Sequence, residues 1–170
     1  MLNPRAVILT GLSITPLLRR WNIKNAVIEA GWYQQYNIET EVTITYLPAK
    51  HWNRRGLTDM NEMLWGSFMI EAVGNTIYFG ADSGLGIHFE AIAHLFPCID
   101  YALLGIGAYQ PEWFMAAAHT SPSDALTAFQ QLKARWFIPM HHGTFDLSDE
   151  PIFYPLQELQ KIAETENMNN

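Results

Sequence analysis

Apolar residues along this chain fall into short runs of strand length and into longer segments with helical spacing. Residues 41–47 alternate polar with apolar and β-branched side chains, which is the pattern of a half-buried strand that ends at Pro48. Residues 64–71 and 76–79 form a second alternating pair joined at Gly74 and Asn75, so we expect a hairpin. Further strands are expected at 6–10, 26–30, 101–105 and 136–140.

Helical spacing occurs in the segments 13–21, 87–95 and 121–134. Ser13 offers a capping hydroxyl to the first helix, and Ser121 is followed by a proline and then by the acidic Asp124, which favours a helix start. Residues 76–105 therefore indicate a strand–helix–strand unit. In such α/β sheets, ligands gather past the carboxyl ends of strands, where Asp82, Tyr109 and His141 would lie.

Composition limits the possible folds and partners. The 170 residues suit one compact domain, expected at 1–160, followed by a frayed polar tail at 161–170. The formal net charge of -7 argues against binding to nucleic acid or to an anionic membrane. A single cysteine, Cys98, excludes an intramolecular disulfide and a cysteine-rich zinc module. Because no signal peptide or transmembrane segment is evident, we expect a cytoplasmic protein.

Three residues that follow predicted strand ends are candidate metal ligands: His51, Asp82 and His141. Imidazole nitrogens and carboxylate oxygens are the zinc ligands that remain when cysteines are scarce. Each residue also has a simpler interpretation. His51 could be a surface or packing histidine, Asp82 could cap the helix that follows it, and His142 competes with His141. The order of the three is more informative than any one of them.

Six sequence blocks carry a resemblance to a known family: LPAKHWNRR (47–55), LWGS (64–67), FGADSG (79–84), GIGAYQPEWFM (105–115), HTSP (119–122) and HHGTF (141–145). They are similar to successive blocks of the N-acyl-phosphatidylethanolamine phospholipase D group of the metallo-β-lactamase superfamily. The resemblance implies an α/β (α+β sandwich) protein corresponding to the C-terminal half of the αββα fold. Bacterial relatives in this group often carry a RomA-type outer-membrane label, which nothing in the sequence supports.

The resemblance also implies roles for single residues. His51 is similar to a histidine ligand of the first zinc, Asp82 to the carboxylate that bridges two zinc ions, and His141 to a histidine on the second zinc. A hydroxide shared by the two metals would be the nucleophile, which makes Asp82 catalytic as well as metal-binding. His119 is similar to a histidine near the substrate, where it would steady the scissile phosphate or the leaving group. His142 is expected to lie behind the metal ligands and to contact them without binding the metal. His88 and His94 match no block and are expected to be structural.

The family's His-x-His-x-Asp-His motif does not occur in this sequence. We therefore expect a fragment, or a half-domain with a partner, that binds zinc weakly and turns over little substrate alone. The implied reaction is hydrolysis of a phosphodiester, with a lipid as one candidate substrate. Lactone or other ester hydrolysis is the nearest chemical alternative. A non-catalytic scaffold or interaction module is the alternative from another class.

Two further features concern the substrate. Lys50, Arg54 and Arg55 flank His51 in an otherwise acidic chain, which predicts a site for an anionic group such as phosphate, although a solvated loop would look the same. Aromatic residues near the predicted site could line a pocket for an acyl chain, or could belong to the core; they are Trp52, Trp65, Tyr109, Trp113 and Phe114.

One half of a two-sheet sandwich leaves an apolar sheet face uncovered. The residues expected on that face are Val42, Ile44, Tyr46, Phe68 and Ile70. A bare apolar face of several hundred Å² exceeds what soluble monomers usually expose. We therefore expect either a homo-oligomer, most simply a two-fold dimer, or a separate N-terminal half that covers it.

Overall fold

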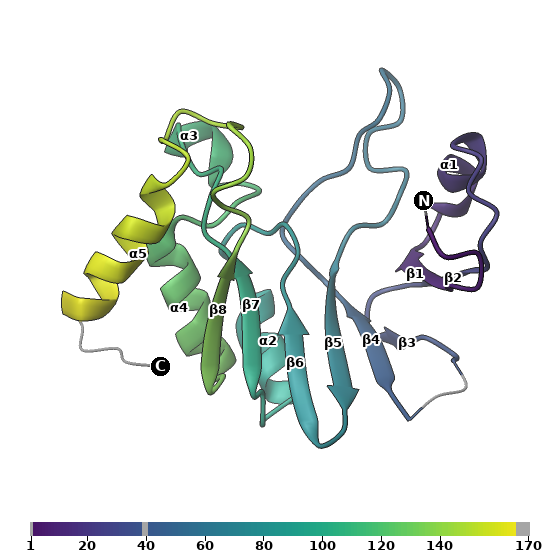
Figure 1. The fold of residues 1–170 in the computed structure, drawn as a ribbon, viewed down its shortest axis with the longest axis horizontal. Helices are drawn as coiled ribbons and strands as arrows, with labels where there is room; N and C mark the ends of the chain where they lie inside the picture. The colour runs from purple at the N-terminus through teal and green to yellow at the C-terminus, as the bar shows by residue number, and fades with distance from the viewer. Residues whose placement is uncertain (1, 39–40, 166–170) are drawn as a thin grey trace.

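The computed structural model describes residues 2–38 and 41–165, which form a large mixed sheet, a small sheet and five helices (Figure 1). The large sheet has the order β3-β4-β5-β6-β7-β8, and the small sheet pairs β1 with β2. The strands are β1 (Ile8–Gly11), β2 (Val27–Ala30), β3 (Gln34–Gln35), β4 (Thr43–Leu47), β5 (Ser67–Ala72), β6 (Asn75–Phe79), β7 (Tyr101–Gly105) and β8 (Trp136–Met140). The helices are α1 (Thr15–Arg20), α2 (His88–Leu95), α3 (Glu112–Met115), α4 (Pro122–Leu132) and α5 (Tyr154–Thr165).

The large sheet is antiparallel at one side and parallel at the other. Strands β3 to β6 pair antiparallel, whereas β6, β7 and β8 pair parallel. The predicted hairpin and the strand–helix–strand unit are both confirmed, since β6 leads through α2 to β7. The predicted capping box of α4 is present as well, between Ser121 and Asp124. Because β6, β7 and β8 run in the same direction, the loops after them open at one edge, which we call the rim.

The main core lies between one face of the large sheet and the helices behind it in Figure 1. Alternate residues of a strand point to the same face, so each of β5, β6 and β7 contributes side chains to this core. Its members include Met69, Tyr78, Ala102 and Leu104 from the strands, Phe89 and Ile92 from α2, and Leu126 and Phe129 from α4. This packing fixes the strands whose ends form the rim.

The opposite face of the sheet has a cover over β4 and β5. Tyr46 is buried in a second cluster with Ala30 and Tyr36, and Ile44 and Phe68 pack against it. The expectation of an uncovered face is therefore wrong for Ile44, Tyr46 and Phe68. The β1–β2 sheet of the same chain supplies apolar side chains that the alternating pattern alone could not assign to a partner.

The same face continues, uncovered, to the edge strand β8. In the register of the sheet, Phe79 pairs with Leu103 and Leu103 with Ile138. Ile138, in the middle of β8, and Trp136, at its start, are 42% and 40% exposed, which is high for large apolar side chains in a strand. We refer to Trp136 and Ile138 as the open β8 face.

Two predicted details at the chain ends differ in the structure. Helix α1 has no capping hydroxyl; instead the Glu29 carboxylate accepts the backbone N–H groups of Ser13 and Thr15 at 3.2 and 2.7 Å. The polar tail expected from 161 is helical as far as Thr165, because Leu159 and Ile162 of α5 pack against the main core. Residues 166–170 of that predicted tail lie outside the described residues.

Candidate metal centre

His51 lies on the loop after β4, and two side chains hold the backbone of that loop. The Trp65 indole N–H donates to the Ala49 carbonyl, and the Ser67 hydroxyl donates to the Pro48 carbonyl, each at 3.0 Å. His51 itself lies with Nδ1 2.6 Å from the Trp52 carbonyl oxygen. Because a carbonyl only accepts, the ring proton belongs on Nδ1, and Nε2 carries the lone pair that a metal ligand needs.

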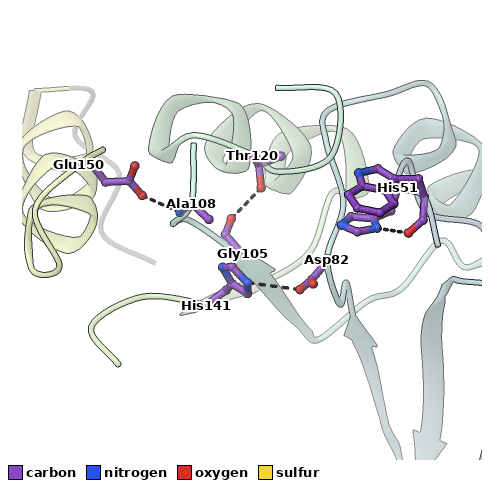
Figure 2. Close-up of polar contacts among 8 residues, drawn as sticks. His51, Asp82, Gly105, Ala108, Thr120, His141 and Glu150 are labelled. Atoms are coloured by element: carbon purple, nitrogen blue, oxygen red, sulfur yellow. Dashed lines mark hydrogen bonds and ion pairs between the residues drawn. The ribbon is translucent and has the colours of Figure 1, made fainter. Parts of the chain in front are cut away.

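Asp82 and His141 meet at the rim from the loops after β6 and β8. His141 Nε2 lies 3.5 Å from Asp82 Oδ1, and Figure 2 shows the two side chains pointing toward one another. Both depend on left-handed backbone: φ is 57° at His141 and 51° at Ala81, directly before Asp82. A positive φ of this size is costly for residues other than glycine and is found more often at functional sites.

His119 lies between His51 and His141. Its ring centroid is 5.3 Å from that of His51 and 5.2 Å from that of His141. The neighbouring Thr120 hydroxyl donates to the Gly105 carbonyl at 2.7 Å, which ties this loop to the end of β7. Burial lowers the pKa of His119, with a smaller contribution from His141, so its ring is neutral at neutral pH.

Close backbone approach at the end of β7 sets the position of His141. A Cβ on Gly107 would collide with the carbonyl oxygen of His141, whereas a Cβ on Gly105 would be in ordinary contact, 3.6 Å from the His141 Cβ. Glycine is therefore required at 107 for packing reasons that do not apply at 105. Gly105 ends β7 and Gly107 lies two residues further on in the loop, so the two glycines make a matched pair.

A cleft of about 530 Å³ joins this cluster to the predicted anion site. Its lining includes His51, Asp82 and His141, the predicted anion-binding Arg54 and Arg55, and an aromatic and apolar wall of Trp52, Trp65, Tyr46, Leu64 and Phe79. Arg54 is oriented by bonds from its guanidinium to the carbonyls of Gly56 and Leu57, at 2.7 and 3.3 Å. The cleft thus places two cationic side chains beside the histidine–carboxylate cluster.

Several predicted substrate residues lie elsewhere. Tyr109 is buried, and its hydroxyl donates to the Glu158 carboxylate of α5. Trp113 and Phe114 are exposed on α3 and do not line the cleft. The Lys50 ammonium donates to the Leu85 carbonyl at 3.0 Å, and Lys50 is absent from the cleft lining. Of the predicted pocket aromatics, Trp52 and Trp65 are the two that the structure brings to the cleft.

Glu150 supports the rim and was missed by the sequence analysis. Its buried carboxylate accepts the backbone N–H groups of Ala108, Tyr109 and Gln110 at 2.6, 3.3 and 3.0 Å. Figure 2 shows it reaching the loop after β7. No local pattern could have found it, because the residues it binds lie about forty positions earlier in the chain.

The donor types of the rim cluster suit zinc, but the number of ligands does not make a whole site. The closest pair, His141 and Asp82, offers an imidazole nitrogen and a carboxylate oxygen. Within residues 2–38 and 41–165, no group of three or more His, Cys, Asp or Glu side chains is arranged to hold a metal ion. The described residues therefore offer donor atoms of the right type but no complete ligand set.

Comparison with known proteins identifies the family. The family model described as Beta-lactamase superfamily domain matches residues 4–142. The chain belongs to the metallo-β-lactamase superfamily. Its structure agrees with the predicted fold class, because metallo-hydrolases of this superfamily have the same arrangement over nearly the whole chain. Igni18, a metallo hydrolase from Ignicoccus hospitalis, covers 93% of the chain with a TM-score of 0.67 at 20% identity, and the chain covers 62% of it.

Proteins similar to the chain include the predicted phospholipase D and RomA relatives. Two are N-acyl-phosphatidylethanolamine-hydrolyzing phospholipases D, from Caenorhabditis elegans (30% identical over 96% of this chain) and Saccharomyces cerevisiae (35% over 81%). The outer membrane protein RomA from Klebsiella pneumoniae is 37% identical over 61% of the chain and is itself covered to 76%. The chain spans 48% and 31% of the nematode and yeast proteins, about half their length or less. Among its described residues, no helix is long and apolar enough to cross a membrane.

The glycine pair gives a direct test of how the rim is built. Gly107→Ala is expected to push the backbone of His141 away and to lower the free energy of unfolding by about 1–3 kcal/mol, as overpacking does. Gly105→Ala is expected to be tolerated. Denaturant unfolding measures the stability, and the NMR shifts of the His141 ring report its displacement. Equal effects of the two substitutions would contradict the assigned close approach.

Proposed function

We propose that this chain carries one side of the active site of a metal-dependent hydrolase that cleaves phosphodiester bonds, with lipid diesters among its substrates. The observation that supports it is the meeting of His51, Asp82 and His141 in a cleft that also contains Arg54 and Arg55. The names of the nematode and yeast relatives, which describe hydrolysis of a phospholipid, favour a diester as the substrate class.

In this proposal the metal is zinc, and His51, Asp82 and His141 are the residues that would hold it. When bound, the metal supplies positive charge that polarises the scissile group. The chain's own contribution is ligand orientation. The Trp52 carbonyl fixes the ring of His51, and the left-handed backbone of His141 turns its ring toward Asp82. Fixed ligands lose less entropy when they bind.

Arg54 and Arg55 hold the anionic oxygens of the substrate. Planar guanidinium groups bind phosphate through paired hydrogen bonds, which gives orientation as well as affinity. The apolar part of the substrate lies against Tyr46, Leu64 and Phe79 on the wall of the same cleft. Lys50 and Tyr109 have no such contact in this proposal, since neither lines the cleft.

His119 acts on the leaving group. A neutral imidazole carries one N–H and one lone pair, so it can donate a proton or accept one near neutral pH. Its place between His51 and His141 puts this ring beside the position at which the diester would be held. Donation from a His119 ring nitrogen stabilises the departing oxygen.

Two alternatives have different consequences. Lactone or ester hydrolysis would use the same groups on a carbonyl carbon, and it predicts that the cleft has no preference for phosphate. A non-catalytic interaction module would have no need of His51, Asp82 and His141 together in one cleft.

The small number of ligands limits what the chain does alone. We propose that it binds zinc weakly and turns over chromogenic phosphodiesters at rates close to those of zinc in buffer. The missing ligands would come from residues that a partner or a further segment of polypeptide brings to the rim. The contacts of Arg54 and Arg55 with an anion do not depend on the missing ligands, so these contacts can be tested without a complete metal site.

Inorganic phosphate tests the anion site without turnover. The double variant Arg54→Gln/Arg55→Gln is expected to bind phosphate about tenfold more weakly than the wild type, since losing a charge-assisted hydrogen bond costs about 1.4 kcal/mol or more. Isothermal titration calorimetry measures the change. The double variant Arg5→Gln/Arg20→Gln removes the same two charges at exposed arginines that do not line the cleft, and serves as the control for net charge. An equal loss in both proteins would refute the anion site.

Self-association is the proposed cover for the open β8 face. Two copies related by a two-fold axis would bury Trp136 and Ile138 against their counterparts, and each Å² of apolar surface removed from water contributes about 25 cal/mol. Ile138→Asp is expected to shift the chain toward monomer in sedimentation velocity at micromolar concentration. Phe153→Asp changes an apolar residue that is also exposed, but lies outside the sheet, and should have no effect. A wild-type monomer under these conditions would exclude the dimer.

A further inference from the structure

The loops that carry His51 and Asp82 are joined through Ser83. The backbone N–H of Lys50 donates to the Ser83 hydroxyl at 2.9 Å, and the N–H of Gly84 donates to the Lys50 carbonyl at 2.8 Å. Lys50 directly precedes His51, and Ser83 directly follows Asp82. These bonds therefore set the separation between two predicted metal ligands that come from different strands.

The Ser83 hydroxyl is held in turn by His88 of α2. His88 Nε2 lies 3.1 Å from Ser83 Oγ, and both side chains are buried. A hydroxyl has one hydrogen and two lone pairs. Its hydrogen is donated to the Gly84 carbonyl at 3.0 Å, and one lone pair accepts the Lys50 N–H. The second lone pair is filled if the proton of a neutral His88 sits on Nε2.

The surroundings of His88 keep its ring in that form. The centroid of the Phe89 ring lies 4.0 Å from that of His88, and a Cβ on Gly86 would come within 3.0 Å of Nδ1. Burial, and then the nearby Lys50 ammonium, lower the pKa of His88 to about 4. At neutral pH the ring therefore carries a single N–H. Because the Ser83 hydrogen is donated to the Gly84 carbonyl, we assign that N–H to Nε2, which faces Ser83.

We propose that His88, acting through Ser83, is a positioning residue that holds the His51 loop against the Asp82 loop. The inference rests on the proposed function in one respect, namely that these two residues bind a metal. It gives a role to a histidine that lies outside the six sequence blocks. It also makes Lys50 a backbone anchor of the site. Without the His88 N–H, the Ser83 hydroxyl is free to rotate away from Lys50, and the two loops can separate.

Amide hydrogen exchange of the whole 170-residue chain tests this positioning. His88→Phe keeps a buried ring but removes the N–H, and it is expected to speed exchange of the Lys50 amide about tenfold. His88→Gln returns an N–H near the position of Nε2 and is expected to restore slow exchange. His94→Phe makes the same change at an exposed position of the same helix and should leave the Lys50 and Gly84 amides unaffected.

Zinc titration of the same proteins separates this inference from the proposed function. Zinc binding that is about tenfold weaker in His88→Phe and recovers in His88→Gln supports both, since residues that orient ligands have effects of this size. Faster Lys50 exchange with no zinc binding in any of the proteins supports the positioning role and overturns the metal assignment. Unchanged Lys50 exchange in His88→Phe overturns the positioning role. If that variant does not fold, Ser83→Ala removes only the hydroxyl, and unchanged exchange in it has the same meaning.

Discussion

The parallel register of β6, β7 and β8 is the constraint on which the candidate site depends. Phe79, Leu103 and Ile138 lie in line across the three strands, so the residues that follow each strand reach the same edge of the sheet. Burial of apolar side chains on the helix-covered face fixes that register, because a shift by one residue would turn those side chains to the wrong face. The meeting of Asp82 and His141 is thus a result of core packing and requires no attraction between them.

Each rim loop has its own restraint, and these restraints resist the strain in the loops. Left-handed backbone at Ala81, Ala108 and His141 disfavours the folded state locally. Glu150 offsets this at Ala108 by accepting three backbone N–H groups, and Ser83 binds the loop after β6 to the loop before His51. A site held in this way is largely preorganised, which is what metal-ligand geometry requires. The core sets where the loops begin, and these polar contacts set where they point.

The sequence was sufficient for features that depend on local pattern. The alternation in 41–47 and 64–79, the capping box at Ser121 and the strand that delivers His141 all follow from neighbouring residues, and the structure has them. Features that depend on distant residues were not predictable. The burial of Tyr46 depends on the β1–β2 sheet. The hydroxyl of Tyr109 donates a hydrogen bond to Glu158, which lies 49 positions away. The roles assigned to His51, Asp82, His119 and His141 came from family resemblance, and the structure adds their proximity.

The central claim is that His51 and His141 belong to one metal-binding cluster in this chain. It is tested most directly by following the ring signals of all six histidines in ¹⁵N-labelled protein during titration with zinc. We expect the His51 and His141 signals both to shift, while those of the buried His88 and the exposed His94 stay in place. A response confined to His94, or a zinc-dependent shift of His51 without one of His141, would contradict the claim.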